Sequence, residues 1–219
     1  MNRILFLVFT VVAARGQEWP VYGGDAGGTR YSSLREINRS NVTRLKTAWT
    51  YHTGDMSDGT QYPVRSAFEA TPLMIDGVLY VVTVFDRLIA LEPETGKELW
   101  AFDPKLDKTR SQMLFSNRGI AHWTNGKEHR LYYGTLDGQL WAINAVNGKP
   151  VDSFGKAGFI DLREGMIDAT DKRGFGRGYG MTSPPAIYKN VVICGSIVPD
   201  SEPQGPLAKA TRARDSVRA

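Results

Sequence analysis

Side chains that could carry out chemistry are few in this sequence, and their spacing excludes several kinds of site. The 219 residues contain a single cysteine, Cys194, which excludes an internal disulfide framework and any cysteine-rich zinc or iron–sulfur site. His52, His122 and His129 lack the spacing of zinc ligands. The alternating glycines of residues 174–180 match neither a dinucleotide-binding fingerprint nor a phosphate-binding loop, so we expect a flexible loop there.

Charged and hydroxyl residues in the expected loops are weak signals when each is taken alone. Glu69 and Asp200 are then expected to be solvated carboxylates, because charged loop residues are common. Arg118 is expected, on the same grounds, to form an ion pair between neighbouring sheets. Three hydroxyl residues recur at equivalent strand ends: Thr83, Thr135 and Ser196. A hydroxyl at such a position usually bonds to the backbone of its turn.

The elements that would position these residues are short β-strands separated by turns. Residues 71–83 predict two strands joined at Asp76-Gly77, because Asp-Gly between β-branched and aromatic runs favours a tight hairpin. Residues 87–100 predict a third strand, a turn at Thr95-Gly96 and a fourth strand that ends at Trp100. No segment after Ala70 keeps helical periodicity for three turns, so the sequence predicts an all-β fold.

The same pattern returns after about fifty residues. Residues 131–148 repeat it at an offset of 52, and a third start lies at 185–196 with a turn at Lys189-Asn190. Upstream, residues 42–49 resemble a closing strand, since Trp49 precedes Trp100 by 51. Three tryptophans are expected to pack between the sheets: Trp49, Trp100 and Trp141.

A period near fifty with four short strands per unit is typical of a β-propeller, whose sheets must stack around an axis. A ring needs at least four such blades, or roughly 200 residues at this period. Between Trp19 and Pro206 the sequence holds one closing strand, two full units and the first half of a third. We therefore expect a partial propeller that belongs to a larger one.

The basic residues do not indicate a nucleic-acid-binding protein. The net charge of +4 arises at the two ends of the chain, whereas residues 17–206 contain 21 basic and 22 acidic residues. A polyanion-binding domain would carry its basic residues on the folded body, so we expect no nucleic-acid partner.

The first sixteen residues predict a cleavable signal peptide. Arg3 precedes an uncharged run from Ile4 to Ala14, and small residues at Ala14 and Gly16 suit cleavage after Gly16. The run is shorter than the roughly 20 apolar residues of a transmembrane helix, and no later segment could span a membrane. A periplasmic or secreted location is therefore expected, with Cys194 buried in the apolar run 191–194.

Six short motifs follow one another between Trp19 and about Pro206. They are residues 19–34 (WPVYGGDAGGTRYSSL), 37–45 (INRSNVTRL), 68–73 (FEATPL), 92–100 (EPETGKELW), 117–123 (NRGIAHW) and 195–200 (GSIVPD). Together they resemble the amino-terminal part of dehydrogenases that depend on pyrroloquinoline quinone (PQQ), and most closely the quinoprotein glucose and alcohol dehydrogenases. The resemblance implies an eight-bladed propeller with PQQ and Ca²⁺ on its axis, of which this chain would form about two and a half four-stranded blades.

The resemblance also implies roles for particular residues. Glu69 matches a glutamate that contacts PQQ, Arg118 matches an arginine that reaches the quinone oxygens, and Thr135 matches a hydroxyl donor to a PQQ carboxylate. Ser196 is a weaker match to a PQQ contact, and Asp200 falls where a carboxylate helps to hold calcium. These residue types suit a cofactor with three carboxylates, which needs charge-assisted donors around its rim.

The implied function is oxidation of an alcohol or sugar hydroxyl, with electrons passed to a quinone or a cytochrome. Arg118 and a carboxylate-bound Ca²⁺ would stabilise the negative charge that develops on the reactive carbonyl of PQQ during hydride transfer. Where relatives carry a cysteine pair or a histidine against PQQ, this sequence has Gln112-Met113-Leu114. The family's catalytic aspartate, metal-binding asparagine and tryptophan floor belong to later blades, so the chain is expected to be an inactive fragment when alone. The alternative is a non-catalytic β-propeller scaffold of the cell envelope.

The last residues depart from the expected repeat. Residues 207–219 are rich in alanine and arginine and lack strand-like alternation, so we expect a disordered basic tail after residues 17–206. An out-of-frame or truncated end of a longer gene would explain the tail. Sequencing the locus tests this hypothesis, because a stop codon with no propeller-like coding sequence downstream in any frame would contradict it.

Overall fold

The structure, a computed structural model, describes residues 17–109, 114–164, 180–196 and 217–218. Its first sheet is antiparallel, with four strands in chain order: β1 (Leu73–Ile75), β2 (Val78–Val82), β3 (Leu88–Leu91) and β4 (Glu98–Phe102). The β1–β2 turn lies where it is predicted, at Asp76 and Gly77. Both residues have the positive φ values, 50° and 79°, that a two-residue hairpin loop requires.

The second sheet repeats this arrangement. It contains β5 (Ala121–Thr124), β6 (His129–Gly134), β7 (Gln139–Asn144) and β8 (Phe159–Asp161), again in chain order. A third sheet has the order β11 (Val217–Arg218), β10 (Val191–Gly195) and β9 (Ala186–Tyr188). The predicted all-β fold, built from repeated four-stranded sheets, is confirmed.

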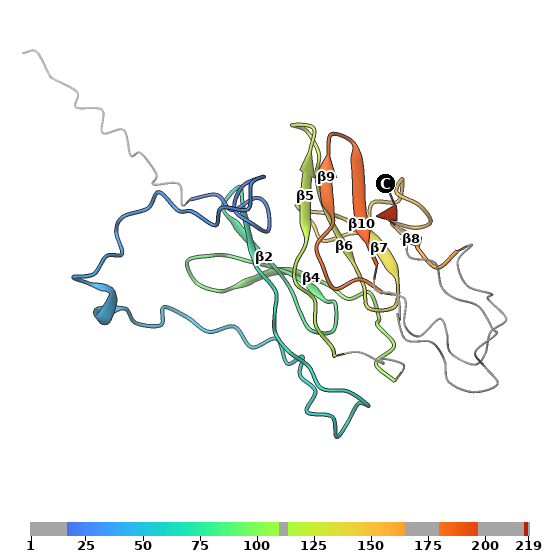
Figure 1. Cartoon of the computed structure of the whole chain (residues 1–219), viewed down its shortest axis with the longest axis horizontal. Helices are drawn as coiled ribbons and strands as arrows, with labels where there is room; N and C mark the ends of the chain where they lie inside the picture. Colours follow the sequence, from blue (N-terminus) through green and yellow to red (C-terminus); the bar gives the residue numbers. More distant parts are fainter. Residues whose placement is uncertain (1–16, 110–113, 165–179, 197–216, 219) are drawn as a thin grey trace, which may run out of the picture.

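The three sheets stack so that the second lies between the other two (Figure 1). Alternation along the strands explains this, because successive side chains point to opposite faces. In β6, Leu131 and Tyr133 join the main core with residues of the first sheet such as Tyr80 and Leu88. In β7, Leu140 packs with Cys194 of the third sheet. The predicted burial of Cys194 is confirmed.

Tryptophans lock neighbouring parts of the stack together. Trp100 of β4 donates a hydrogen bond from Nε1 to the Ala145 carbonyl at 3.1 Å, and its ring covers Gly148 of the second repeat. Trp49 makes the same contact one repeat earlier: its Nε1 donates to the Pro93 carbonyl at 2.9 Å, and its ring covers Gly96. The predicted packing between sheets is confirmed for Trp100, whereas Trp49 packs on the first sheet from a segment that forms no strand. Trp141 of β7 also bridges two sheets, because its ring lies 4.9 Å from that of Phe102 in β4.

The predicted closing strand at residues 42–49 is wrong. Val42–Arg44 form a short 3₁₀ helix, η1, and residues 45–49 contain no strand. A strand requires a backbone ladder, whereas Trp49 reaches the first sheet through its side chain. In Figure 1 this amino-terminal segment runs out from the sheets as a long arm, and nearly all residues from 25 to 48 are exposed.

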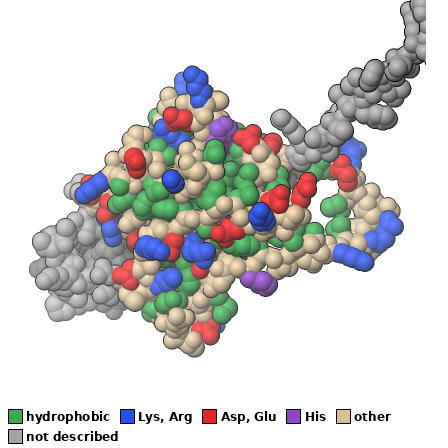
Figure 2. Space-filling model, turned by 180° about the vertical axis from the view of Figure 1, so that it is seen from behind, with side chains coloured by type: hydrophobic (Ala, Val, Ile, Leu, Met, Phe, Trp, Pro, Cys, Tyr) green, Lys and Arg blue, Asp and Glu red, His purple; other side chains and the backbone are tan. Residues whose placement is uncertain are grey.

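Two further observations bear on the expected partners. Acidic and basic side chains are interspersed over the face shown in Figure 2 and form no single basic field. Within the described ranges, no helix has the length and apolar character needed to cross a membrane.

Val217–Arg218 belong to the segment expected to be a disordered tail, yet they pair with β10 through Cys194 and Gly195. Residues 1–16, the predicted signal peptide, and residues 207–216 lie outside the described residues, so the domain boundaries remain predictions.

Candidate functional site

One polar side chain stands shortly before the first strand of each sheet, at nearly the same place in all three. Glu69 lies four residues before β1, Arg118 three residues before β5, and Thr182 four residues before β9. Because the sheets are stacked, equivalent strand starts lie side by side, and these three side chains meet. The stacked sheets thereby form one polar cluster from segments far apart in the sequence.

Arg118 is the centre of this cluster. Its Nη2 lies 3.3 Å from Glu69 Oε2, and its Nη1 donates to the Thr182 hydroxyl at 2.7 Å. The Arg118 and Glu69 side chains are 43% and 36% exposed, so the ion pair remains accessible to a ligand. The structure thus brings together the predicted residues Glu69 and Arg118 and adds Thr182, which is 7% exposed.

Backbone hydrogen bonds hold Arg118 between the neighbouring segments. The Arg118 N–H donates to the Thr182 carbonyl at 2.7 Å, and the Thr71 N–H donates to the Arg118 carbonyl at 2.9 Å. The loop before β5 is therefore fixed to the first sheet on one side and to the third on the other. The guanidinium direction depends on the stacking of all three sheets.

Beneath Arg118 lies a buried pair, Asp86 and Asn117. Asn117 Nδ2 donates to Asp86 Oδ1 and to the Gly134 carbonyl, each at 2.9 Å. The Leu136 N–H donates to the other Asp86 oxygen at 2.8 Å. Burial raises the pKa of Asp86 to about 8, although the Asn117 and Leu136 hydrogen bonds oppose this shift.

Thr135 has a structural task in the turn between β6 and β7. Its hydroxyl donates to the Asp137 carboxylate and accepts from the Gln139 N–H at 3.0 Å, and its side chain is fully buried. Thr83 has the same task in the turn between β2 and β3, where its hydroxyl accepts from the Arg87 N–H at 3.2 Å. The turn role expected of these hydroxyls is confirmed, whereas a cofactor contact of Thr135 stays a prediction.

Two further residues, Ser196 and Asp200, are predicted to hold the cofactor or its metal. Ser196 follows β10 and is partly buried, and its suggested cofactor contact stays a prediction. Asp200, the expected calcium ligand, lies outside the described residues, as do Gln112 and Met113. In the part of the chain that is described, no three His, Cys, Asp or Glu side chains are grouped to hold a metal ion.

Sequence reasoning missed Thr182, Asp86 and Asn117. A signal for Thr182 exists in the repeat, since it has the same place before β9 that Glu69 has before β1. Asn117 directly precedes Arg118, but nothing in its residue type reveals a partner 31 positions away. That partnership depends on how the sheets stack.

Comparison with known proteins decides the family. The family described as "PQQ: Glucose/ethanol/alcohol dehydrogenase, beta-propeller domain" matches residues 19–218. The chain belongs to this family of PQQ-dependent dehydrogenases. The match extends past Pro206, at which the sequence resemblance ended, and includes the strand β11.

Individual family members give the same result. The quinoprotein glucose dehydrogenase of Escherichia coli (strain K12) is 36% identical over 193 residues, which are 83% of this chain and 24% of that protein. The dehydrogenase subunit of the alcohol dehydrogenase (quinone) of Gluconacetobacter polyoxogenes is 38% identical over 183 residues, 81% of this chain and 21% of that protein.

A solved structure supports the propeller fold. The quinohemoprotein alcohol dehydrogenase of Comamonas testosteroni superposes with a TM-score of 0.65 at 30% identity, over 85% of this chain and 24% of that one. The predicted fold, a partial β-propeller of the PQQ-dehydrogenase type, is confirmed. The chain spans about a quarter of the length of the relatives that it matches.

Proposed function

We propose that this chain supplies the amino-terminal part of a PQQ- and calcium-dependent dehydrogenase that oxidises an alcohol or sugar hydroxyl and passes the electrons to a quinone or a cytochrome. The main support for this proposal is that Glu69, Arg118 and Thr182 come together from the starts of three stacked sheets. The proposal includes a periplasmic location, and it includes inactivity of the 219-residue chain when alone.

The chemistry of the cluster suits PQQ. Its three carboxylates require cationic and neutral donors, and an arginine fork is the strongest such donor among the side chains. Thr182 and Glu69 each engage one terminal nitrogen of Arg118, and the guanidinium has further N–H groups that can donate to a ligand. A half-exposed arginine that is already held at two points loses little freedom when it binds an anion.

The residues of this chain would act by orientation and charge. When bound, PQQ supplies the two-electron acceptor for oxidation of the substrate hydroxyl. Arg118, whose Nη1 is fixed by Thr182, would donate hydrogen bonds to the quinone oxygens of the bound cofactor. Glu69 holds Nη2 of Arg118, and its negative charge partly offsets the positive charge of the guanidinium. Asp200 would supply one carboxylate to Ca²⁺, a ligand type that this cation prefers.

Direct titration of the cofactor tests the site. PQQ with Ca²⁺ is added to the purified full chain, and binding is followed by absorbance and by quenching of tryptophan fluorescence. Arg118→Ala is expected to weaken binding about tenfold or more, since it removes charge-assisted hydrogen bonds. Arg163→Ala is the matched control, because Arg163 pairs with Asp161 at 2.7 Å in the second sheet and is comparably exposed.

Equal binding by wild type and Arg118→Ala would contradict the proposed site. Dye reduction with glucose or ethanol tests the rest of the proposal. The isolated chain is expected to bind the cofactor without turnover, and turnover at a rate typical of enzymes would refute its inactivity alone.

A further inference from the structure

The buried pair Asp86 and Asn117 connects three segments around the candidate site. Asp86 is 0% exposed and lies in the turn between β2 and β3, while Asn117 is 2% exposed and directly precedes Arg118. The third segment is the turn between β6 and β7, which Asp86 meets at Leu136 and Asn117 meets at Gly134. The pair therefore joins the first sheet, the second sheet and the Arg118 loop.

These contacts close into a ring of hydrogen bonds. From Asn117 the chain leads to Arg118, whose N–H donates to the Thr182 carbonyl at 2.7 Å. Next to Thr182, the Met181 N–H donates to the Thr135 carbonyl at 2.9 Å. The neighbour of Thr135 is Leu136, which donates back to Asp86. The Asn117 side chain also accepts from the Gly119 N–H at 3.1 Å, so it braces the Arg118 loop from inside.

The repeat indicates that Asp86 is not required by the turn itself. The equivalent residue of the second sheet, 52 positions later, is Gly138, and both adopt left-handed backbone conformations with φ of 61° and 84°. Glycine suits this conformation better than any residue with a Cβ atom. In the first sheet, the buried carboxyl group of Asp86 stands where the second sheet has glycine, and two N–H groups donate to its oxygens.

We infer that Asp86 is a positioning residue, which holds the Arg118 loop through Asn117 and thereby fixes the direction in which the guanidinium faces a ligand. The inference rests on the proposed function, since Arg118 is the residue that it positions. Asp86 itself does not contact the ligand in this arrangement, because it lies fully buried beneath the loop.

The Asp86→Asn variant tests the inference with almost no change of shape. An amide at position 86 must place its NH₂ group against either the Asn117 amide or the Leu136 N–H, both of which are donors. Rotation of the Asn117 amide moves the conflict to the Gly119 N–H and removes the donor to the Gly134 carbonyl. The substitution therefore breaks the ring without opening a cavity.

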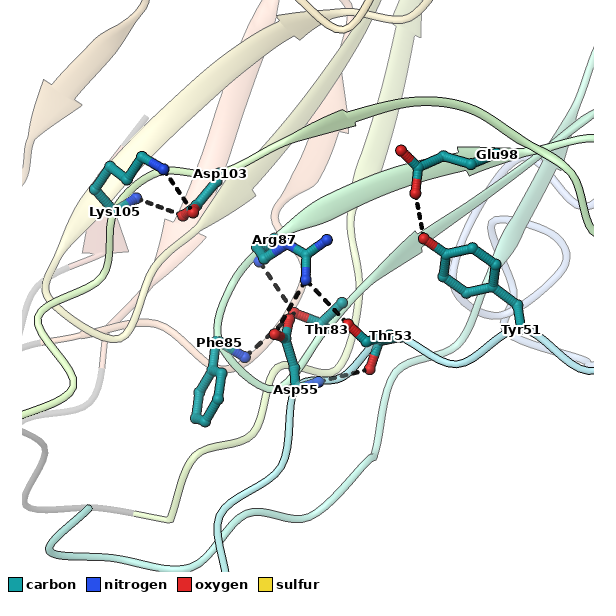
Figure 3. A network of polar contacts seen from close by, with 9 residues as sticks. All are labelled: Tyr51, Thr53, Asp55, Thr83, Phe85, Arg87, Glu98, Asp103 and Lys105. Atoms are coloured by element: carbon teal, nitrogen blue, oxygen red, sulfur yellow. Dashed lines mark hydrogen bonds and ion pairs between the residues drawn. The ribbon is translucent and has the colours of Figure 1, made fainter. Parts of the chain in front are cut away.

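Asp55→Asn is the matched control. Asp55 stabilises the same β2–β3 turn from its other side, where it accepts from the Thr83 hydroxyl at 2.6 Å and from Arg87 Nη1 at 3.1 Å (Figure 3). Among the hydrogen bonds found in the described residues, none joins Asp55 to the Arg118 loop. The control weakens the turn but leaves the ring intact.

Amide hydrogen exchange of the full chain, measured by NMR without cofactor, is the primary experiment. Asp86→Asn is expected to accelerate exchange of the Arg118 and Gly119 amides about tenfold, the effect of losing one to two buried hydrogen bonds. Amides within β2 and β6 are expected to keep their rates, and Asp55→Asn is expected to leave Arg118 and Gly119 unchanged. Unchanged rates at these two amides in Asp86→Asn, or an equal increase throughout the chain, would overturn the inference.

A double variant that swaps the two side chains tests whether the effect of Asp86→Asn arises from the lost pairing with Asn117 or from a general loss of stability. In the double variant Asp86→Asn, Asn117→Asp, the amide at 86 donates to the carboxyl group at 117 and accepts from Leu136, and a protonated carboxyl at 117 donates to the Gly134 carbonyl in place of the Asn117 amide. Protection of Arg118 and Gly119 is expected to return to within about threefold of wild type. If Asp86→Asn alone does not fold, this variant still provides the test, and loss of protection in it would overturn the inference.

Titration with PQQ and Ca²⁺ then relates the ring to the proposed function. Asp86→Asn is expected to bind about tenfold more weakly and Asp55→Asn as wild type does. Absence of PQQ binding by the wild type would refute the proposed cofactor site. The hydrogen-exchange rates are measured without cofactor, so they test the role of Asp86 independently of PQQ binding.

Discussion

The contact of Trp100 with Gly148 predicts a large and specific effect of one added methyl group. A Cβ atom at position 148 would lie 2.5 Å from Trp100 Cε3 and 2.6 Å from Cδ2, whereas carbon atoms normally stay about 3.5 Å apart. The indole ring of the Gly148→Ala variant must therefore move by about 1 Å. Gly126→Ala is the matched control. Gly126 also has a positive φ, 84° compared with 70° for Gly148, and a Cβ atom added at Gly126 would have no other atom within 4 Å.

The magnitude follows from the contacts that the ring loses. Both variants place alanine in the left-handed region, which costs about 1–2 kcal/mol in each and cancels in the comparison. Overpacking at Gly148 costs about 1–3 kcal/mol more. The hydrogen bond from Trp100 to the Ala145 carbonyl, 3.1 Å long, cannot survive a shift of that size, and it is worth about 1 kcal/mol. Gly148→Ala should thus be about 2–4 kcal/mol less stable than Gly126→Ala.

Urea denaturation of the full chain, followed by tryptophan fluorescence, measures this difference. A difference below about 1 kcal/mol would refute the steric argument. A double-mutant cycle adds a second condition: in a Trp100→Leu background, Gly148→Ala should cost no more than Gly126→Ala, because the ring that it displaces is gone. An undiminished cost in that background would show that the effect arises elsewhere.

Three further predictions concern the candidate site and its surroundings. Arg118→Lys keeps the charge but cannot contact Glu69 and Thr182 as a planar fork, so PQQ affinity should fall about tenfold while the urea midpoint stays unchanged; retained affinity would contradict the fork geometry. Tyr133→Phe should stabilise the chain by about 1 kcal/mol in urea denaturation, because the buried Tyr133 hydroxyl has no hydrogen-bond partner among the described residues, and destabilisation would contradict this. Burial, with a smaller contribution from Asp137, raises the folded-state pKa of Asp86 from 3.8 to about 8, so the folded chain retains a proton that the unfolded chain releases. Stability should therefore fall as pH rises from about 4 to 8, by at most 1.36 kcal/mol per pH unit for this group, and the difference between wild type and Asp86→Asn across that range should show the slope.

The sequence predicts the sheets well because their determinants are local. Alternating side chains, the Asp76-Gly77 turn and the Gly96 and Gly148 turns each specify a strand or its end from neighbouring residues alone. The strand predicted at residues 42–49 is wrong because that prediction, too, used neighbouring residues alone. Its tryptophan obeys the repeat, but a strand also requires a backbone partner, and the local pattern does not reveal whether one is present.

The candidate site is predicted only in part. The family motifs single out Glu69 and Arg118, and the structure pairs them. Thr135 satisfies the same motif criterion, yet its hydroxyl is engaged in its own turn. Thr182 and Asp86 escape prediction because their roles depend on contacts across sheets, 64 and 31 positions from their partners.

Departures from the repeat coincide with the candidate site. Where the second sheet has Gly138 the first has Asp86, and the exception coincides with the hydrogen-bond ring around Arg118. The starts of the three sheets differ in the same way: a carboxylate, a guanidinium and a hydroxyl stand within one position of the same place in the repeat, and the guanidinium of Arg118 contacts the other two. A repeat selected for packing alone would keep these positions similar, because equivalent positions meet equivalent surroundings. Their divergence into complementary groups therefore supports a binding site at this end of the sheets.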